Sequence, residues 1–192
     1  NEPVGIDIEI AENGRWFISN DSKKTIFEIN LGADGEFGTS DDKRRAFLTS
    51  AFGNNDPEGL TLGGGKLYTV DGGGARVYIT QDGGNGIYEG SDPTTWFDVA
   101  GIGIRDPEGI DYDPRTGHLW IVDRSRKRLN EVTTTGNLLQ SIDLRTLVGA
   151  VNPGDVTLAP SSTGSGELNL YIADRGVDNN VDPNENDGKI YE

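Results

Sequence analysis

Two loops of this 192-residue chain carry closely spaced acidic side chains that could bind a metal ion. The first loop runs from 30 to 45 and holds Asp34, Glu36, Asp41 and Asp42, with three glycines that bend the chain between them. Calcium takes about six to eight oxygen ligands, from carboxylates and from carbonyls that a tight turn points inward. The spacing is not that of an EF-hand. We expect an irregular calcium site here, and the alternative is a hairpin loop made of turn formers.

The second acidic loop lies between 173 and 192. Its candidate ligands recur at mostly alternating positions before a glycine: Asp178, Asp182, Asn184, Asn186 and Asp187. The middle of this run imitates the start of an EF-hand, but the glycine comes one residue late and no Glu follows at the twelfth place. Long ordered loops in compact domains are usually functional or stabilised by a metal. We therefore expect calcium here as well, with disorder as the alternative.

The composition limits the classes of partner. The formal net charge is −15, and such a surface repels phosphate backbones, so we expect no nucleic-acid partner. The chain has no Cys, and no apolar run of about 18 residues predicts insertion into a membrane. It begins at Asn1 without an initiator Met, which is typical of a mature secreted form or of a piece of a longer polypeptide. We expect an extracellular or cell-surface protein.

Residues for catalysis are sparse. The one His, His118, is expected at the start of a strand, and no nucleophile elbow, Walker loop or zinc motif is present. The turn from 124 to 128 is the one cationic patch, and it is either a solvated turn or a site for an anion or an acidic partner.

The elements that must position these residues are revealed by an internal repeat. The tetrapeptide DPEG occurs at 56–59 and again at 106–109, and related phrases begin at Glu2 and Asn152. Every phrase has Pro at its second place, and the prolines are separated by 54, 50 and 46 residues. A second phrase follows in each segment, within RWFISND, KLYTVDG, HLWIVDR and NLYIADR, and ends on Asn20, Asp71, Asp123 or Asp174. Its aromatic residues are taken as equivalent in the four segments: Trp16, Tyr68, Trp120 and Tyr171.

Each unit predicts four short strands separated by turns, except that the last unit ends after three. A unit of this kind cannot bury both faces alone, but it can when stacked against its neighbours. The sequence therefore predicts an all-β protein, a β-propeller with blades of about 2–55, 56–105, 106–151 and 152–192. Either the ring has four blades, or the chain is a segment of a larger propeller.

The third unit resembles an NHL-type repeat. The match includes Pro107, Gly109 and Ile110, then the Leu119-Trp120-Ile121 strand core, followed by Asp123 and Arg128. The chain is also similar to the SdiA-regulated and phytase-esterase-like propellers, which favour an acidic residue before the glycine of the first phrase. This resemblance implies a propeller, and its metal-dependent members imply a calcium ion in the central channel.

That acidic place is occupied by Glu58 and Glu108. In a propeller this loop enters the innermost strand at the mouth of the channel, where equivalent residues of different blades converge. Pro and Gly explain the bend of the chain there, but they do not explain the acid between them. Converging carboxylates repel one another unless a cation or a proton lies between them. With Asp155 of the last unit, these residues are the candidates for a channel metal, and the alternative is a set of solvated loop acids.

Two functions follow as expectations. The first is a non-enzymatic, calcium-stabilised scaffold or interaction module that binds a protein, a glycan or another copy of itself. The second is a calcium-dependent hydrolase of the phytase, esterase or lactonase type, in which a channel metal polarises an ester or a phosphate.

Overall fold

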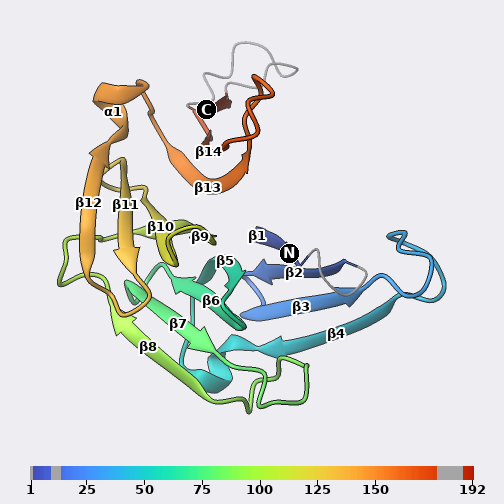
Figure 1. Ribbon diagram of the computed structural model, residues 1–192. Helices are drawn as coiled ribbons and strands as arrows, with labels where there is room; N and C mark the ends of the chain where they lie inside the picture. Colours follow the sequence, from blue (N-terminus) through green and yellow to red (C-terminus); the bar gives the residue numbers. More distant parts are fainter. Residues whose placement is uncertain (1, 10–13, 177–187) are drawn as a thin grey trace, which may run out of the picture.

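The structure, a computed structural model, describes residues 2–9, 14–176 and 188–192, and these residues form a nearly all-β protein. The strands fall into four antiparallel sheets in chain order, called blades 1 to 4 below. Figure 1 shows the sheets fanning out around a common axis, with the first strand of each sheet innermost. The chain is therefore a four-bladed β-propeller, as its repeated phrases predict.

Each blade meanders outward from the axis, so strands that are consecutive in sequence pair with one another. Blade 1 consists of β1 (Pro3–Glu9), β2 (Arg15–Asn20), β3 (Thr25–Asn30) and β4 (Lys43–Leu48). Blade 2 consists of β5 (Pro57–Gly63), β6 (Lys66–Asp71), β7 (Arg76–Thr80) and β8 (Thr94–Asp98). Blade 3 consists of β9 (Pro107–Asp113), β10 (His118–Asp123), β11 (Arg128–Thr133) and β12 (Leu138–Asp143). Within the described residues, blade 4 consists of β13 (Pro153–Pro160), β14 (Leu168–Asp174) and β15 (Lys189–Tyr191).

Two short helices join consecutive blades. The 3-10 helix η1 (Thr49–Phe52) leads from blade 1 to blade 2, and α1 (Leu144–Leu147) leads from blade 3 toward blade 4. The side chain of Asp143 caps α1 by accepting a hydrogen bond from the amide of Arg145 at 3.0 Å. No helix among the described residues is long and apolar enough to span a membrane.

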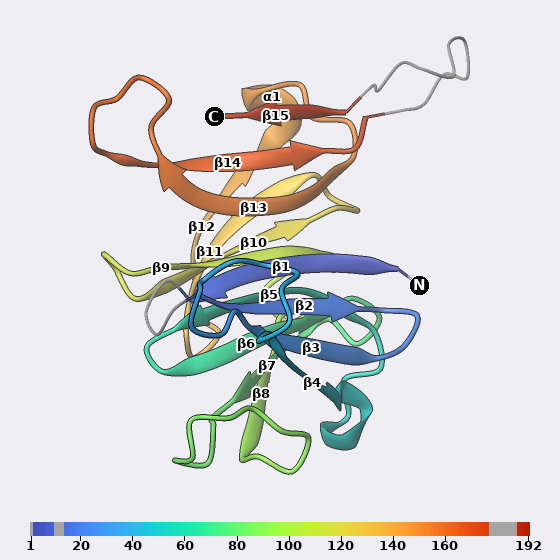
Figure 2. The same cartoon turned by 90° about the vertical axis from the view of Figure 1, so that its right-hand side faces the viewer.

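The hydrophobic core lies between the blades. Side chains of β-strands alternate between the two faces of a sheet, so each blade offers one apolar face to the preceding blade and one to the next. The core between blades 1 and 2 includes Phe17 and Leu60, and that between blades 2 and 3 includes Tyr68 and Ile110. Trp120 packs in the core between blades 3 and 4. In Figure 2, turned by 90°, the inner strand β13 lies above β9 and β1.

The strand register corrects one predicted equivalence. Tyr68, Trp120 and Tyr171 pair with residues 61, 111 and 157 of the inner strands. In blade 1 the matching inner residue, Asp7, pairs with Phe17. The prediction that Trp16 is the equivalent aromatic residue is therefore wrong. Trp16 lies on the opposite face of β2, where its ring stacks on Phe37 with the ring centroids 4.9 Å apart.

Candidate functional site: the acidic end of the propeller axis

The candidate site lies at the end of the axis where the inner strand of each blade begins and the second strand ends. In blades 2, 3 and 4 the proline of the first phrase pairs with the Asp that ends the second phrase, as Pro57 does with Asp71. In blade 1, Pro3 pairs with Asn20. The register therefore brings the DPEG turns and the ends of the second strands together in space.

The glycine of the DPEG phrase is required by the close approach of neighbouring backbones. A Cβ on Gly59 would lie 2.6 Å from the carbonyl oxygen of Glu108 and 2.9 Å from the Cα of Gly109. A Cβ on Gly109 would lie 2.5 Å from the Cα of Asp155. Neither glycine has a positive φ, so the prediction that glycine serves a tight turn here is wrong. At these two glycines the inner strands lie so close together that no side chain fits between them.

Three carboxylates from two blades converge beside these glycines. Asp21 follows β2, and Asp56 and Glu58 flank the start of β5. One carboxylate oxygen from each of the three lies within 4.8 Å of the others, and no other group of three acids or histidines meets this condition among the described residues. No Lys or Arg of the described chain forms an ion pair with them within 4.0 Å. We call Asp21, Asp56 and Glu58 the acidic triad.

The electrostatics of the triad favour a bound proton or cation. Burial raises the pKa of Glu58 to about 8, and repulsion from Glu108, Asp56 and Asp21 adds to the rise. The pKa of Asp21 is also raised, first by burial and then by its hydrogen bond and repulsion with Asp56. A metal ion would supply the positive charge that these carboxylates lack.

Glu108, the counterpart of Glu58, has a different environment. It is 2% exposed, and its two carboxylate oxygens each pair with an arginine. The Oε1 atom lies 3.0 Å from Nη1 of Arg124, and the Oε2 atom lies 2.7 Å from Nη2 of Arg175. Arg124 also pairs with Asp106 at 3.0 Å. Burial raises the pKa of Glu108 and both arginines oppose that rise. Two guanidiniums thus occupy the place that a metal would take.

Asp155, the third predicted channel residue, lies apart from the triad on β13. Its Oδ1 atom accepts a hydrogen bond from the amide of Val156 at 2.9 Å, and its backbone packs against Gly109. Burial raises its pKa to about 6. The structure does not bring Glu58, Glu108 and Asp155 together as one set of three ligands.

The polar residues that end the second strands act within the fold. Asp174 accepts hydrogen bonds from the amides of Val151 and Asn152, both at 2.7 Å, and from that of Gly176 at 3.0 Å. Asp123 accepts from the amide of Arg105 at 3.0 Å. These side chains tie the turn after β10 or β14 to the segment that enters the blade, which agrees with a capping role.

The predicted calcium loop at 30–45 is exposed, and its carboxylates bond to its own backbone. Asp41 accepts from the amide of Ala33 at 2.7 Å, Asp42 from that of Gly38 at 2.8 Å, and Asp34 from that of Glu36 at 2.9 Å. The loop acids do not form a group of three within 4.8 Å. Asp42 Oδ1 is nevertheless buried without a hydrogen-bond partner. Calcium binding here stays a prediction.

The second predicted loop cannot be compared with the structure. Its candidates, Asp178, Asp182, Asn184, Asn186 and Asp187, lie outside the described residues.

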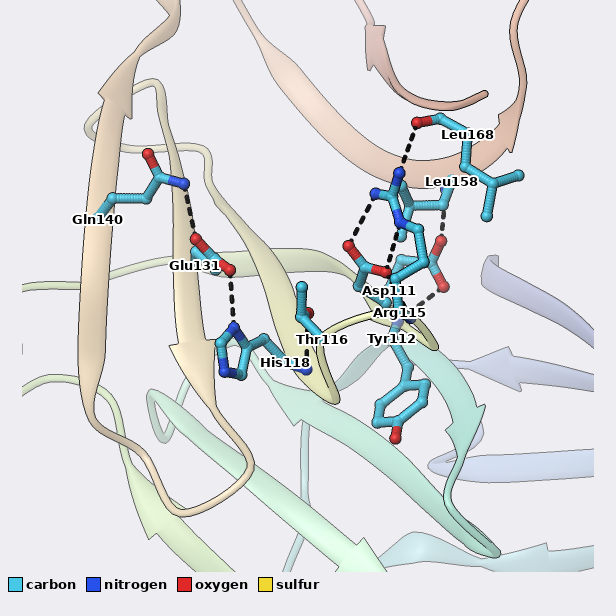
Figure 3. Close-up of polar contacts among 10 residues, drawn as sticks. Asp111, Tyr112, Arg115, Thr116, His118, Glu131, Gln140, Leu158 and Leu168 are labelled. Atoms are coloured by element: carbon cyan, nitrogen blue, oxygen red, sulfur yellow. Dashed lines mark hydrogen bonds and ion pairs between the residues drawn. The ribbon is translucent and has the colours of Figure 1, made fainter. Parts of the chain in front are cut away.

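At the opposite end of the axis, the acids are engaged in contacts between blades. Asp111 Oδ2 accepts from the amide of Leu158 at 2.5 Å, as Figure 3 shows, and Asp7 Oδ2 accepts from that of Leu62 at 2.6 Å. A cavity of about 320 Å³ is lined there by these acids and by Tyr112. His118 starts β10 on blade 3, and its Nδ1 atom pairs with Glu131 at 2.8 Å (Figure 3). It does not contact the acidic triad.

Asp21, Asp56 and Arg175 of the acidic end were not identified as site residues from the sequence, and Arg124 was identified only as part of the cationic turn from 124 to 128. The signal that could have found Asp21, Arg124 and Arg175 is the residue that follows the second strand. This residue is Asp21 in blade 1, Gly72 in blade 2, Arg124 in blade 3 and Arg175 in blade 4. The acidic residue, Asp21, is part of the triad, and Gly72 lies beside Asp56 and Glu58. The two basic residues pair with Glu108.

Antiparallel blades of three or four described strands, arranged around an axis, define this chain as a β-propeller of the NHL-like class. The sequence model of the SdiA-regulated family matches residues 6–173. The chain belongs to the SdiA-regulated family. No curated protein matches it.

Solved propellers of low sequence identity share the fold. Virginiamycin B lyase from Staphylococcus aureus is 19% identical with a TM-score of 0.58, and the match covers 98% of this chain and 55% of the lyase. A luciferin-regenerating enzyme is 16% identical with a TM-score of 0.62, over 99% of this chain and 59% of the enzyme. A chain of a nidogen–laminin complex is 17% identical with a TM-score of 0.59, over 89% of this chain and 55% of that one. The chain thus spans little more than half the length of these structures.

Proposed function

We propose that this chain is a calcium-binding β-propeller module that holds the ion at the acidic triad and acts by binding a partner. The observation that carries the proposal is the convergence of three carboxylates within 4.8 Å, none of which forms an ion pair with a basic side chain among the described residues. The counterpart site on blade 3 supports it, because there two arginines neutralise the equivalent glutamate.

The chemistry of the triad favours calcium over a transition metal. All three side chains offer carboxylate oxygens, the ligands that hard cations prefer, and no imidazole or thiolate belongs to the group. Three carboxylates leave ligand positions for water or for oxygen atoms of a partner. An affinity in the range of extracellular calcium sites, with a dissociation constant of about 0.1–1 mM, fits so few protein ligands. Because an affinity in this range is typical of extracellular calcium sites, we propose that the protein acts outside the cell.

Binding rather than catalysis is supported by the groups around the triad. The one imidazole of the chain, His118, pairs with Glu131 and is not among the triad's contacts. Beside the triad lie arginines that are already paired with Glu108. A calcium ion with free ligand positions can bridge to oxygen atoms of an acidic protein segment or of a glycan. These two classes and a second copy of the chain are the partners we propose.

Calorimetric titration of the chelator-treated protein with calcium tests this proposal. We expect about one calcium per chain to depend on the triad, and a rise in the melting temperature, because an ion that binds only the folded state stabilises it. Glu58→Gln should abolish that binding event. Asp42→Asn in the exposed loop is the matched control and should retain it. Binding that survives Glu58→Gln but is lost in Asp42→Asn would locate the ion in the loop and contradict the proposal.

A calcium-dependent hydrolase is the second candidate. It is favoured by one observation, that Arg124 and Arg175 lie close enough to the triad to interact electrostatically with Glu58. A metal next to guanidiniums is suited to a phosphate or an ester. Calcium-dependent turnover of a phosphate monoester or an aryl ester, lost in Glu58→Gln, would favour this candidate over the binding module.

A further inference from the structure

A small cavity lies against blade 1, at the end of the blade where β2 and β4 begin and β3 ends. Its volume is about 190 Å³, which is room for roughly six water molecules. We call it the mixed-charge cavity, and its lining includes residues of β2, β3, β4 and the loop between β7 and β8: Arg15, Glu28, Asn30, Lys43, Arg45 and Gly86. Strand pairing places Asn30 beside Lys43 and Glu28 beside Arg45 on one face of the sheet. Phe17, the partner of Glu28 on β2, packs in the core between blades 1 and 2, so this face is the one turned toward blade 2.

Glu28 contributes a buried carboxylate that is only half satisfied. The residue is 4% exposed, and its Oε1 atom lies 3.4 Å from Nη1 of Arg15, which is long for a charge-assisted hydrogen bond. Its Oε2 atom is buried and has no hydrogen-bond partner among the described residues. Buried carboxylate oxygens are normally hydrogen-bonded, because the loss of water must be offset by another donor. Glu28 Oε2 is therefore a free acceptor in the wall of the mixed-charge cavity.

Arg15 does not satisfy this acceptor, because its donors are engaged elsewhere. Its Nε and Nη2 atoms both donate to Glu9 Oε2, at 2.8 and 2.5 Å, and its Nη1 atom donates to the carbonyl oxygen of Gly86 at 2.6 Å. The guanidinium is also held over the ring of Phe17, with its central carbon 5.3 Å from the ring centroid. One arginine thus serves two carboxylates, Glu9 and Glu28, so the base of the cavity retains a negative charge.

The rim of the cavity has the opposite charge. Lys43 and Arg45 lie on the outer strand of blade 1, are exposed, and form no ion pair within 4.0 Å with a carboxylate of the described chain. Asn30 accepts from the amide of Gly32 at 3.1 Å through its side-chain oxygen, which leaves its side-chain nitrogen as a donor next to the two cations. The mixed-charge cavity therefore combines a carboxylate at its base with two cations at its rim.

We propose that this cavity binds a small zwitterion, a compound with an ammonium group and a carboxylate on one short carbon chain, such as a small α-amino acid. The ammonium group pairs with Glu28, and the carboxylate pairs with Lys43 and Arg45. A metal cation would find a single carboxylate and would be repelled by the rim, whereas a simple anion would be repelled by Glu28. The volume limits the ligand to about six non-hydrogen atoms. The cavity shares no residue with the acidic triad, so the proposal does not depend on calcium binding there.

NMR titration of the isotope-labelled protein with L-alanine and two of its fragments tests the proposal. Ethylamine keeps the ammonium group and lacks the carboxylate, and propionate keeps the carboxylate and lacks the ammonium group. We expect L-alanine to shift the amide signals of Glu28, Lys43 and Gly86 with a dissociation constant in the millimolar range, which fits a ligand of about six non-hydrogen atoms. Each fragment should bind at least about tenfold more weakly. A fragment that binds as tightly as L-alanine, or no shift with L-alanine up to about 100 mM, would overturn the proposal.

Single substitutions test which residues hold the ligand. Glu28→Gln keeps the size of the side chain, removes its charge and should weaken the binding of L-alanine at least about tenfold. Arg45→Gln changes an exposed side chain, so the fold should persist, and it should weaken binding about threefold to tenfold. Arg44→Gln is the matched control, because Arg44 is also exposed but lies on the opposite face of β4, and it should leave binding unchanged.

Two results with these variants would overturn the proposal. An equal loss of affinity in Arg44→Gln and Arg45→Gln would mean that only the general charge of β4 attracts the ligand. Tighter binding in Arg45→Gln would mean that Arg45 itself is the partner of Glu28 and competes with the ligand.

Discussion

The two copies of DPEG place the same glutamate at the same point of the fold and give it opposite surroundings. Glu108 is 2% exposed, and each carboxylate oxygen pairs with an arginine. Glu58 is partly exposed, lies next to Asp21 and Asp56, and has its pKa raised to about 8. The difference comes from the residue after the second strand, which is an arginine in blades 3 and 4 and is Asp21 or Gly72 in blades 1 and 2. The repeated phrase therefore fixes the position of the glutamate, whereas the residue after the second strand determines the charges around it.

The largest effect should come from the feature that the two copies share. Gly59→Ala and Gly109→Ala should each lower the free energy of unfolding by about 3 kcal/mol, because the added Cβ would overlap the next inner strand. Urea unfolding measures the loss. Gly101→Ala is the control, since its Cβ would meet nothing nearer than 3.8 Å. If the two glycine variants differed by more than the error, the backbones of the two copies would not be equivalent.

The next effect separates the copies. Glu108→Gln should cost about 2 kcal/mol, because it removes the charged partner of Arg175 and one of the two charged partners of Arg124. The cost stays below that of a fully buried pair, since both guanidiniums reach solvent. Thermal unfolding in chelator at pH 7 measures it. An unchanged melting temperature would mean that the arginines find other partners and that the ion pairs of Glu108 do not stabilise the fold.

In the absence of calcium, Glu58→Gln should raise the stability of the fold, whereas Glu108→Gln lowers it. The folded state binds the proton of Glu58 more tightly than the unfolded state, where the pKa is near the ordinary 4.5. The stability of the native sequence should therefore fall as the pH rises from about 4.5 to about 8, and then level off. Glu58→Gln lacks this loss, so in chelator above pH 8 it should be the more stable protein, by about 1 kcal/mol.

The pH dependence of unfolding with and without Glu58 measures this difference. Glu36→Gln, in the exposed loop, is the control and should retain the native pH dependence. Identical slopes for the native protein and Glu58→Gln would show that Glu58 is ionised in the ordinary range.

The smallest change in stability, and the sharpest comparison, should come from Gly72→Arg. It introduces in blade 2 the arginine that blade 3 has at Arg124. We expect the guanidinium to pair with Glu58, to lower its pKa and to weaken calcium binding at least about tenfold, with stability changed by less than about 1 kcal/mol. Gly101→Arg adds the same charge elsewhere and should bind calcium normally. Unchanged calcium affinity in Gly72→Arg would show that the ion does not bind at the triad.

The repeated phrases were sufficient to predict the blades, because proline, glycine and strand-ending Asp recur at fixed places in each of them. In blade 1 it was harder to predict which side chains of the second strand point toward blade 2. Trp16 and Phe17 are adjacent and both aromatic, and only the strand register shows that Phe17 points that way. The triad could not be predicted from the DPEG phrase alone. Asp56 and Glu58 belong to that phrase, but the third member, Asp21, follows the second strand of another blade, so the charge balance of the triad depends on the packing of blades 1 and 2.

The hydrogen bonds between inner strands also predict where the protein opens first. Within the described residues, blades 2 and 3 each pack between two blades, whereas blades 1 and 4 each pack against one, so local unfolding should require least free energy at blades 1 and 4. The amides of Leu62, Tyr112 and Leu158 donate to the preceding blade and should exchange their hydrogens slowly. The amide of Ile8 donates to Asp7, its neighbour in sequence, and to no other blade among the described residues, so it should exchange orders of magnitude faster. Protection at Ile8 would therefore report directly that another blade has arrived.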